Sequence, residues 1–247
     1  MPDEGTLLGV WAHPDDETYL SAGLMAAAVR AGERVVCVTA TRGEEGSFDE
    51  ERWPTATMGA VREAELLASL AVLGVAEHHW LDYRDGACAD VAHAEGVARV
   101  RAFVEEVRPA RIVTFGPDGM TGHDDHRAVS AWTTEAFHAA APAGTRLLYA
   151  TYTPEWGAEF VEMMNRFNVF MEPGTPPLTP VDELAVDFEL PTDLLELKLA
   201  AIEEHVSQVE GMMQAFGPDF FRRAMKAEFF RLGAAKPAAE PAAEVPA

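Results

Sequence analysis

The chain has 247 residues, 48% of them hydrophobic, and a formal net charge of −22 at pH 7. This length and apolar content are sufficient for one full hydrophobic core. The acidic balance excludes binding to nucleic acid or to an anionic membrane through a basic surface.

Short apolar runs alternate with stretches of helical periodicity over the first 152 residues. The runs are continuous and rich in Val and Leu, which is typical of strands covered on both faces. We expect strands at 6–12, 34–40, 77–81, 111–115 and 146–152, and helices at 18–31, 58–73, 92–107 and 127–140. The alternation predicts a Rossmann-like α/β fold of three layers with a mainly parallel sheet. No Gly-x-Gly-x-x-Gly follows the first strand, so the dinucleotide-binding fingerprint is absent.

The C-terminal part continues the α/β pattern less regularly. We expect a helix at 155–171, a proline-rich loop at 173–180, a strand at 185–189, and helices at 192–214 and 218–231. Together with the N-terminal part they make one domain over residues 1–233. Residues 234–247 consist mainly of Ala, Pro and Glu. Such a segment cannot bury a core, and we predict a disordered tail.

A histidine and two carboxylates stand at the first junction between strand and helix. His13, Asp15 and Asp16 follow the expected strand at 6–12 and precede the helix at 18–31. In open α/β sheets, ligands bind outside the carboxyl ends of the strands, where such junctions lie. Charged groups packed together there are costly unless a cation binds between them.

A second polar cluster occupies the matching position later in the chain. A Gly-rich loop leads from the strand at 111–115 into His123-Asp-Asp-His126, and a helix follows. If the two strands are parallel neighbours, both loops open on the same edge of the sheet. His13, Asp16 and His126 can then close on one metal ion. Two histidines, one carboxylate and an open position are the ligands of a catalytic zinc site.

Both clusters resemble the signature motifs of a known family. Ala12-His-Pro-Asp-Asp-Glu17 and Gly122-His-Asp-Asp-His126 are similar to the two motifs of the PIG-L/LmbE zinc-dependent N-deacetylases. Members of that family remove acetyl groups from N-acetylglucosaminyl conjugates in mycothiol, bacillithiol and GPI-anchor synthesis. The first motif matches without change, and the second has Asp124 where the family usually has proline. Weaker matches extend the resemblance over most of the chain: Thr41-Arg-Gly-Glu-Glu-Gly46, Arg62-Glu-Ala-Glu65 and His205-Val-Ser-Gln208.

The resemblance implies a ligand set and a general base. Asp16 is the carboxylate ligand beside His13 and His126, and its neighbour Asp15 is the base; the residues alone do not choose between the two aspartates. The implied cofactor is Zn²⁺, and Fe²⁺ would fit the same ligands. Zinc lowers the pKa of its bound water to about 7, so this water attacks the amide.

Further roles follow from the same resemblance. His123 is free to stabilise the oxyanion or to protonate the leaving amine, and Asp125 would orient His123 and favour its imidazolium form. Substrate contacts are expected from Arg62, Asp85 and Glu44.

Each substrate contact has a structural alternative. Arg62 could pair with Glu65 on a surface helix. Asp85, which precedes Gly86, is typical of a turn, and Glu44 could face solvent.

Three other positions leave questions open. Glu17 is expected to interact with the positive end of a helix dipole. His205 matches a family feature whose role the sequence does not reveal, and a histidine packed under the site is an equal alternative. Gly43-Glu-Glu-Gly46 with Arg52-Trp53 resembles the mycothiol-pathway deacetylase. That enzyme has a catalytic tyrosine where this chain has Thr121, so the role is vacant here or is taken by another group.

The predicted function is therefore zinc-dependent removal of acetyl from the N-acetyl group of an N-acetylglucosamine-type conjugate. An amidase acting on a larger N-acyl or thiol-conjugate substrate is the first alternative, and a non-catalytic metal-binding Rossmann-like module is the second. A pure binding site would need neither Asp15 nor His123, which argues against the second alternative. A nucleotide-binding oxidoreductase or methyltransferase is disfavoured by the missing fingerprint.

A cytoplasmic location is expected. The sequence has no run of about 18 apolar residues, and its first residues are acidic, so neither a membrane span nor a signal peptide is predicted. Cys37 and Cys88 lack the spacing of a thiolate metal site, and two cysteines fit a reducing compartment. The expected partner is a small-molecule substrate, without nucleic acid or membrane; the sequence leaves the oligomeric state open, and a homo-oligomer is compatible with it.

Overall fold

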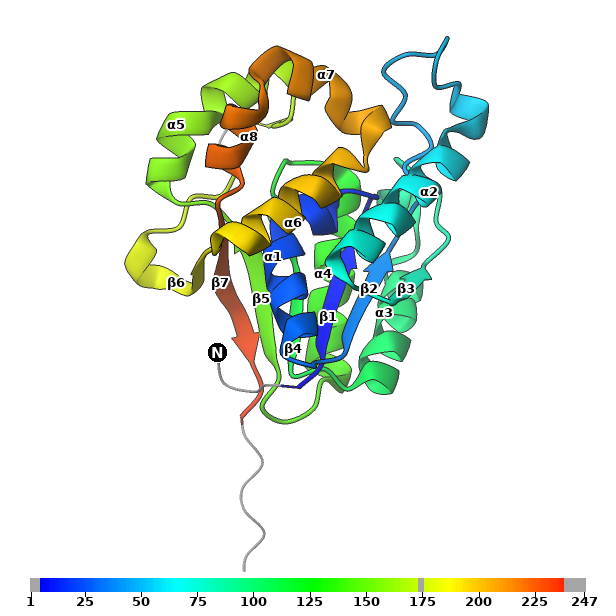
Figure 1. Cartoon of the computed structure of the whole chain (residues 1–247). Helices are drawn as coiled ribbons and strands as arrows, with labels where there is room; N and C mark the ends of the chain where they lie inside the picture. Colours follow the sequence, from blue (N-terminus) through cyan, green and yellow to red (C-terminus); the bar gives the residue numbers. More distant parts are fainter. Residues whose placement is uncertain (1–4, 173–175, 238–247) are drawn as a thin grey trace, which may run out of the picture.

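The computed structural model of the chain describes residues 5–172 and 176–237. Over these residues the chain forms a seven-stranded sheet in the order β3-β2-β1-β4-β5-β7-β6, with helices on both faces (Figure 1). The strands are β1 (Leu7–Trp11), β2 (Val35–Thr39), β3 (Glu77–Trp80), β4 (Arg111–Phe115), β5 (Arg146–Thr151), β6 (Leu184–Glu189) and β7 (Ala227–Ala235). The helices are α1 (Asp16–Arg30), α2 (Thr55–Leu73), α3 (His93–Val107), α4 (Asp124–Ala140), α5 (Pro154–Met164), α6 (Thr192–Glu203), α7 (Val206–Phe216) and α8 (Pro218–Ala224).

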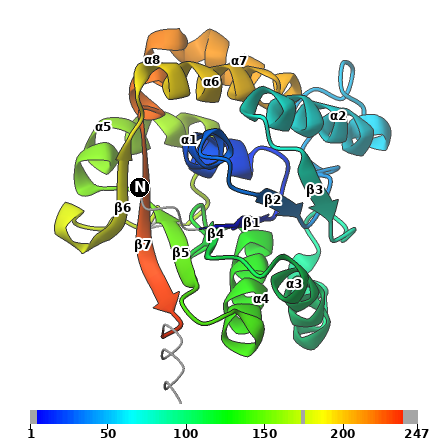
Figure 2. The same cartoon turned by 60° about the horizontal axis from the view of Figure 1, so that its bottom comes forward.

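Five neighbouring strands, from β3 at one edge to β5, are parallel and confirm the predicted fold class. β1 pairs with β2 on one side and with β4 on the other, with Leu7 opposite both Val35 and Arg111. Every residue of β1, β2 and β4 is buried. The reason is visible in Figure 2, where α1 and α2 cover one face of the sheet, with α6 packed on them, and α3 and α4 cover the other. Continuous apolar runs are what strands with two covered faces require.

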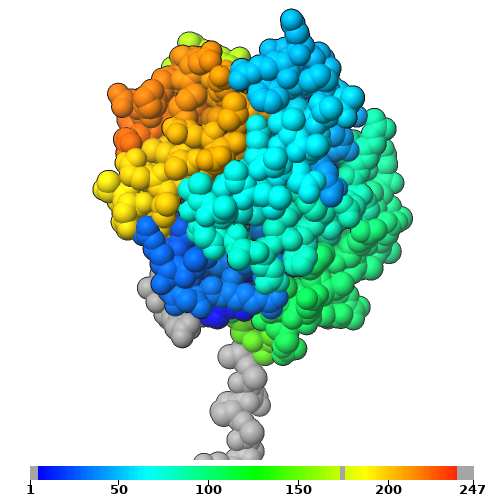
Figure 3. Space-filling model, turned by 45° about the vertical axis from the view of Figure 1, so that its right-hand side comes forward, coloured from blue at the N-terminus to red at the C-terminus, as the bar shows by residue number. Residues whose placement is uncertain are grey.

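On the face shown in Figure 3, the residues of α2 lie beside those of α6 and α7.

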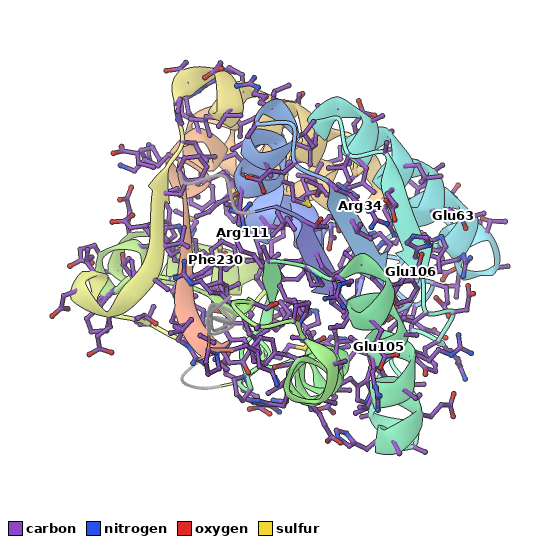
Figure 4. The ribbon with its side chains drawn as sticks, turned by 90° about the horizontal axis from the view of Figure 1, so that it is seen from below. Arg34, Glu63, Glu105, Glu106, Arg111 and Phe230 are labelled. Atoms are coloured by element: carbon purple, nitrogen blue, oxygen red, sulfur yellow. The ribbon has the colours of Figure 1, made fainter. Side chains whose placement is uncertain are left out.

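Charged side chains pair at the amino ends of the parallel strands. Figure 4 looks at the opposite end of the parallel strands, where Arg111 begins β4 and pairs with Glu33. Arg34 pairs there with Glu77 at 2.5 Å. Two ion pairs thus lie at the amino ends of the strands, whereas the two motifs follow β1 and β4 at the carboxyl ends.

The C-terminal part differs from the sequence-based prediction. The expected helix at 192–214 is two helices, α6 and α7, which are separated at Glu204 and His205. The expected helix at 218–231 ends at Ala224, and β7 follows it antiparallel to β5 and β6. Within β7, Glu228 and Phe230 are buried while their neighbours are less so. This alternation with a period of two is the pattern of a strand, but a buried glutamate obscured it in the sequence.

Glu228 is buried because it pairs with a lysine inside the helical layer. Lys198 Nζ lies 2.8 Å from Glu228 Oε1, and both side chains are 1% exposed. Lys198 also donates to the Tyr19 carbonyl at 2.7 Å, while Glu228 accepts the backbone N–H groups of Gly23 and Leu24 at 2.7 and 2.8 Å. In a regular α-helix the Gly23 N–H would bond to the Tyr19 carbonyl. The ion pair therefore bridges two turns of α1, the helix that begins with Asp16.

The end of the sheet lies later in the chain than predicted. β7 continues to Ala235, and Lys236 N donates to Thr145 O at 2.9 Å. Residues 234–236, which were expected in the tail, thus continue β7 and its hydrogen bonds beyond residue 233. Residues 238–247 of the predicted tail, and 173–175 of the predicted loop, lie outside the described residues. Within the described part of the chain, every helix is too short or too polar to cross a bilayer.

Candidate active site

The two motifs meet at the carboxyl ends of β1 and β4, as their sequence context predicts. His13 and Asp16 lie between β1 and the first turn of α1, and His126 lies in the first turn of α4. His13 Nδ1 is 3.0 Å from His126 Nε2, and Asp16 places carboxylate oxygens 3.5 Å from His126 Nε2 and 3.8 Å from His13 Nδ1. All three residues are buried. The candidate metal ligands therefore converge on one point.

Hydrogen bonds to the outer ring nitrogens fix the tautomers of both histidines. His126 Nδ1 lies 3.0 Å from the Gly119 carbonyl, which can only accept, so Nδ1 carries a proton and Nε2 a lone pair. His13 Nε2 lies 3.0 Å from Asp85 Oδ1 and 3.2 Å from Asp125 Oδ2, so it donates to carboxylate. The remaining nitrogens face each other across 3.0 Å. A positive charge must lie between them: either a proton on His13 Nδ1 or a metal ion.

The separations and the charges fit a metal ion. Bonds of about 2.0–2.1 Å in a tetrahedral zinc site place the ligand atoms roughly 3.3 Å apart; the two histidine nitrogens are 3.0 Å apart, and Asp16 Oδ1 is 3.5 Å from one of them. Burial lowers the pKa of His13, but its hydrogen bonds to Asp125 and Asp85 and the charge of Asp16 raise it to about 10. Without a metal ion, a proton therefore occupies the gap. A metal ion would displace this proton.

The pKa values of the neighbouring carboxylates also indicate that a cation would be stabilising at this position. Burial raises the pKa of Asp16 to about 7, and the charge of Asp15 adds to this effect while His13 opposes it. Burial also raises the pKa of Asp15, and Arg62 opposes that shift. A cation at the centre would stabilise the ionised form of both aspartates.

Two other groups of metal-ligating side chains share His13. One combines His13 with His123 and His126, and the other combines it with Asp85 and Asp125. The second group uses His13 Nε2, where the two carboxylates form the outer partners typical of a metal-bound histidine. We favour the set with Asp16 because its backbone contacts hold the carboxylate in place: Asp16 Oδ2 accepts the His13 N–H at 2.8 Å.

The Asp15 carboxylate bonds to Arg62 rather than to the candidate metal ligands. Asp15 has φ 109°, a backbone region that side-chain-bearing residues rarely adopt. Its Oδ2 accepts from Arg62 Nη2 at 3.1 Å. Arg62 is 5% exposed and also donates to the Pro14 and Gly43 carbonyls. A Cβ at Gly43 would lie 2.0 Å from Arg62 Nη1, so only glycine leaves room for this contact.

The structure argues against the structural alternative for Arg62, which was a pair with Glu65 on a surface helix. The alternative partner, Glu65, instead accepts from Ser207 N and Oγ, both at 2.7 Å. Arg62 is buried and holds the loop that carries Asp15. Its contact with a substrate stays a prediction.

His123 is the N-cap residue of α4. Its Nδ1 accepts from Asp125 N at 3.1 Å, so neutral His123 carries its proton on Nε2. Burial lowers the pKa of His123, and the charge of His13 lowers it further. His123 is therefore a neutral donor through Nε2 rather than an imidazolium.

This geometry corrects the expected role of Asp125. Its carboxylate does not contact the His123 ring; it accepts from His13 Nε2 at 3.2 Å and from the backbone N–H groups of Gly86 and Cys88 at 2.8 and 2.9 Å. The sequence suggested His123 because the two residues are close in the chain. Asp125 instead orients His13, which comes from the other motif.

The other two residues that were predicted to contact the substrate, Asp85 and Glu44, form a hydrogen-bonded group next to His13. Asp85 Oδ2 accepts from Glu45 N at 3.0 Å, and Glu44 Oε1 accepts from Asp85 N at 3.0 Å. The other oxygen of Glu44 is buried without a hydrogen-bond partner among the described residues. Thr121, at the position of the family's tyrosine, places Oγ1 3.3 Å from His126 Nδ1. Asp85 thus contacts His13, whereas Glu44 keeps a free acceptor for a ligand.

Glu17 and His205 form a buried network. Glu17 lies in the first turn of α1, as expected, and is fully buried, and His205 is packed inside the protein, as its structural alternative predicted. Burial opposes its ionisation, but a hydrogen bond and charge from His205 lower its pKa. A histidine and a glutamate separated by 187 intervening positions gave no sequence signal beyond the isolated match at His205.

Comparison with known proteins agrees with this geometry. The PIG-L family, described as GlcNAc-PI de-N-acetylase, matches residues 8–137. A 1D-myo-inositol 2-acetamido-2-deoxy-alpha-D-glucopyranoside deacetylase of Rhodococcus erythropolis (strain PR4 / NBRC 100887) is 31% identical over 238 residues. The alignment covers 82% of this chain and 81% of that protein.

Solved structures share the fold at lower identity. N,N'-diacetylchitobiose deacetylase from Pyrococcus horikoshii has a TM-score of 0.65 at 21% identity, over 92% of this chain and 83% of its own. The 4-carboxy-2-hydroxymuconate hydratase of Pseudomonas putida KT2440 has a TM-score of 0.63 at 16% identity, over 96% of this chain and 100% of its own. A deacetylase and a hydratase on one fold show that the fold alone does not fix the reaction.

Proposed function

The chain belongs to the PIG-L family of GlcNAc-PI de-N-acetylases, and we propose that it removes the acetyl group from an N-acetylglucosamine-type conjugate. The observation that carries the proposal is the convergence of His13, Asp16 and His126, with Asp15 held beside them by Arg62. A metal ligand set and an adjacent carboxylate are what amide hydrolysis by an activated water requires.

Zinc is the ion that we propose for this site. His13 Nδ1, an oxygen of Asp16 and His126 Nε2 would hold it, and iron(II) is the alternative for the same donors. When bound, the ion would lower the pKa of a water molecule and polarise the amide carbonyl. The tautomers fixed by Asp85, Asp125 and Gly119 leave both histidine lone pairs directed at this position.

The protein's own groups would then move the protons. Asp15 takes the proton from the attacking water, and burial, which raises its pKa, favours its role as a proton acceptor near neutral pH. His123 donates a hydrogen bond from Nε2 to the carbonyl oxygen as negative charge develops there and keeps its proton. The proton held by Asp15 passes to the nitrogen of the leaving amine, which completes the cleavage of the C–N bond.

We propose a neutral conjugate as the substrate, of which glucosaminyl-inositol is the first example to test. Asp85 contacts His13 and Glu44 contacts Asp85, and the free oxygen of Glu44 is the acceptor that we propose for a sugar hydroxyl group. Arg62 already bonds through both terminal nitrogens to Asp15 and to backbone carbonyls. An anionic aglycone such as malate would meet these carboxylates without an available partner on Arg62.

Acetate release tests this proposal. The zinc-loaded chain is incubated with the N-acetylglucosaminyl conjugates of inositol and of malate, with and without a chelator. We expect chelator-sensitive acetate release, faster from the inositol conjugate, and restoration by added zinc. Release that is undiminished after complete metal removal would contradict the proposed chemistry. Faster release from the malate conjugate would contradict the substrate class alone.

A further inference from the structure

Glu17 lies where it can control the conformation of the proposed base. It is fully buried in the first turn of α1, and its Oε2 accepts the backbone N–H of Asp15 at 3.2 Å. The Asp15 carbonyl accepts from Thr18 N and Tyr19 N, both at 2.9 Å. Both backbone polar groups of Asp15 are therefore held, in a residue whose φ is 109°.

The strained backbone has a geometrical consequence. Asp15 and Asp16 are adjacent, but their carboxylates serve different partners: Asp15 bonds to Arg62 at 3.1 Å, and Asp16 lies 3.5 Å from His126 Nε2. Strain of this kind persists only where the surroundings over-determine it. The Glu17 carboxylate supplies such a constraint, because it is the acceptor of the Asp15 N–H.

The other oxygen of Glu17 is fixed from two further elements. Thr18 Oγ1 donates to Glu17 Oε1 at 2.6 Å and lies 2.8 Å from Ser69 Oγ on α2. His205 Nε2, from the junction of α6 and α7, lies 3.6 Å from Glu17 Oε1 and 3.2 Å from Thr18 Oγ1. His205 is also fully buried. Side chains from α1, α2 and the C-terminal helices thus hold one carboxylate.

We propose that Glu17, anchored by His205, is a positioning residue that keeps Asp15 in its left-handed conformation and so places the general base beside the metal centre. The proposal rests on the proposed function insofar as Asp15 is the base. It assigns a purpose to the last residue of the first motif and to His205, which lies far from it in the sequence.

Glu17→Gln tests the proposal with little change in volume. Both carboxylate oxygens of Glu17 accept hydrogen bonds, from Asp15 N and from Thr18 Oγ1. A glutamine has only one acceptor oxygen, so one of these donors would face an NH₂ group. A misplaced base would lose part of the roughly 10²–10⁴-fold that general-base catalysis contributes, and we expect kcat to fall by about 10–100-fold with little change in KM.

A double-mutant cycle separates positioning from a general structural effect. The second background is Asp15→Asn, because asparagine tolerates the left-handed region but is no base. In that background Glu17→Gln should change kcat by less than about twofold. An equal loss of kcat in both backgrounds would overturn the proposal, as would full activity of the single variant.

A crystallographic measurement makes the test independent of turnover. In zinc-loaded crystals we expect a positive φ at residue 15 in the wild type and a relaxed, negative φ in Glu17→Gln, with zinc affinity unchanged. A positive φ in both proteins would overturn the positioning role even if the enzyme proves to act on another substrate. If the proposed function fails, no conjugate releases acetate, whereas this structural outcome still stands. His205→Asn provides a second variant, with the same expected change, should Glu17→Gln not fold.

Discussion

Replacing each of the two adjacent aspartates by alanine should give opposite results for metal binding. Asp16 lies among the candidate ligand atoms, whereas Asp15 bonds to Arg62. Asp16→Ala therefore removes a metal ligand, and bound zinc and activity should fall together. Asp15→Ala leaves His13, Asp16 and His126 in place, so zinc should remain near one ion per chain.

The size of the Asp15→Ala effect follows from its role as base. Loss of general-base help costs roughly 10²–10⁴ in rate, which corresponds to about 2.7–5.4 kcal/mol in activation free energy. The loss should appear in kcat rather than KM, because the base acts in the chemical step. For Asp16→Ala, zinc affinity should fall by more than the ~10–100-fold that loss of an outer hydrogen-bond partner costs.

The assay combines metal analysis after dialysis with acetate release under saturating substrate. Asp124→Ala is the matched control, since this aspartate lies in the second motif but its side chain is 76% exposed; it should keep both zinc and activity. Exchanged outcomes, with zinc lost from Asp15→Ala and kept by Asp16→Ala, would show that the roles of the two aspartates are reversed. Full activity of Asp15→Ala would refute its assignment as the base.

Three further predictions concern stability. Lys198→Met should lower the free energy of unfolding by about 3–5 kcal/mol in urea denaturation, because it leaves Glu228 buried without its cation; adding Glu228→Leu should recover part of this loss, and no recovery would argue against the ion pair as the cause. Burial lowers the pKa of His78 to about 4 from 6.5, so the unfolded state takes up the proton first and stability should fall as the pH drops from 6.5 to 4. His78→Phe should reduce the dependence of the unfolding free energy on pH in this range. An unchanged dependence would show that other groups cause it. Truncation after residue 237 should leave the melting temperature and activity unchanged, whereas truncation after residue 233 should lower the melting temperature because it removes the end of β7.

Local patterns in the sequence were sufficient to predict the N-terminal half of the fold. Of the five parallel strands, β1, β2 and β4 are mainly apolar and fully buried. His13 follows β1 and His126 follows β4, so the strand order alone brings the two motifs together. The C-terminal elements depend on tertiary contacts instead. Glu228 can be buried in a strand only because Lys198 pairs with it from α6. The two residues belong to different elements, so local sequence patterns do not reveal the pair.

The roles of the outer residues were hidden for the same reason. Asp125 is next to His123 in the chain but bonds to His13 across the site. Glu17 looked like a helix-capping charge, and only the packing of three elements shows that it holds the Asp15 backbone. Sequence spacing predicts that the two motifs meet, and the family resemblance predicts Asp16 rather than Asp15 as the ligand, whereas the hydrogen bonds around these residues follow from topology.

The position of the metal ion tests the central claim most directly. Crystals of the zinc-loaded chain, measured at the zinc absorption edge, should show one strong anomalous peak. We predict bonds of about 2.0–2.2 Å from that ion to His13 Nδ1, an Asp16 oxygen and His126 Nε2, with Asp15 outside bonding distance. An ion bound instead to His13 Nε2 with Asp85 and Asp125, or no peak at His13, would contradict the account.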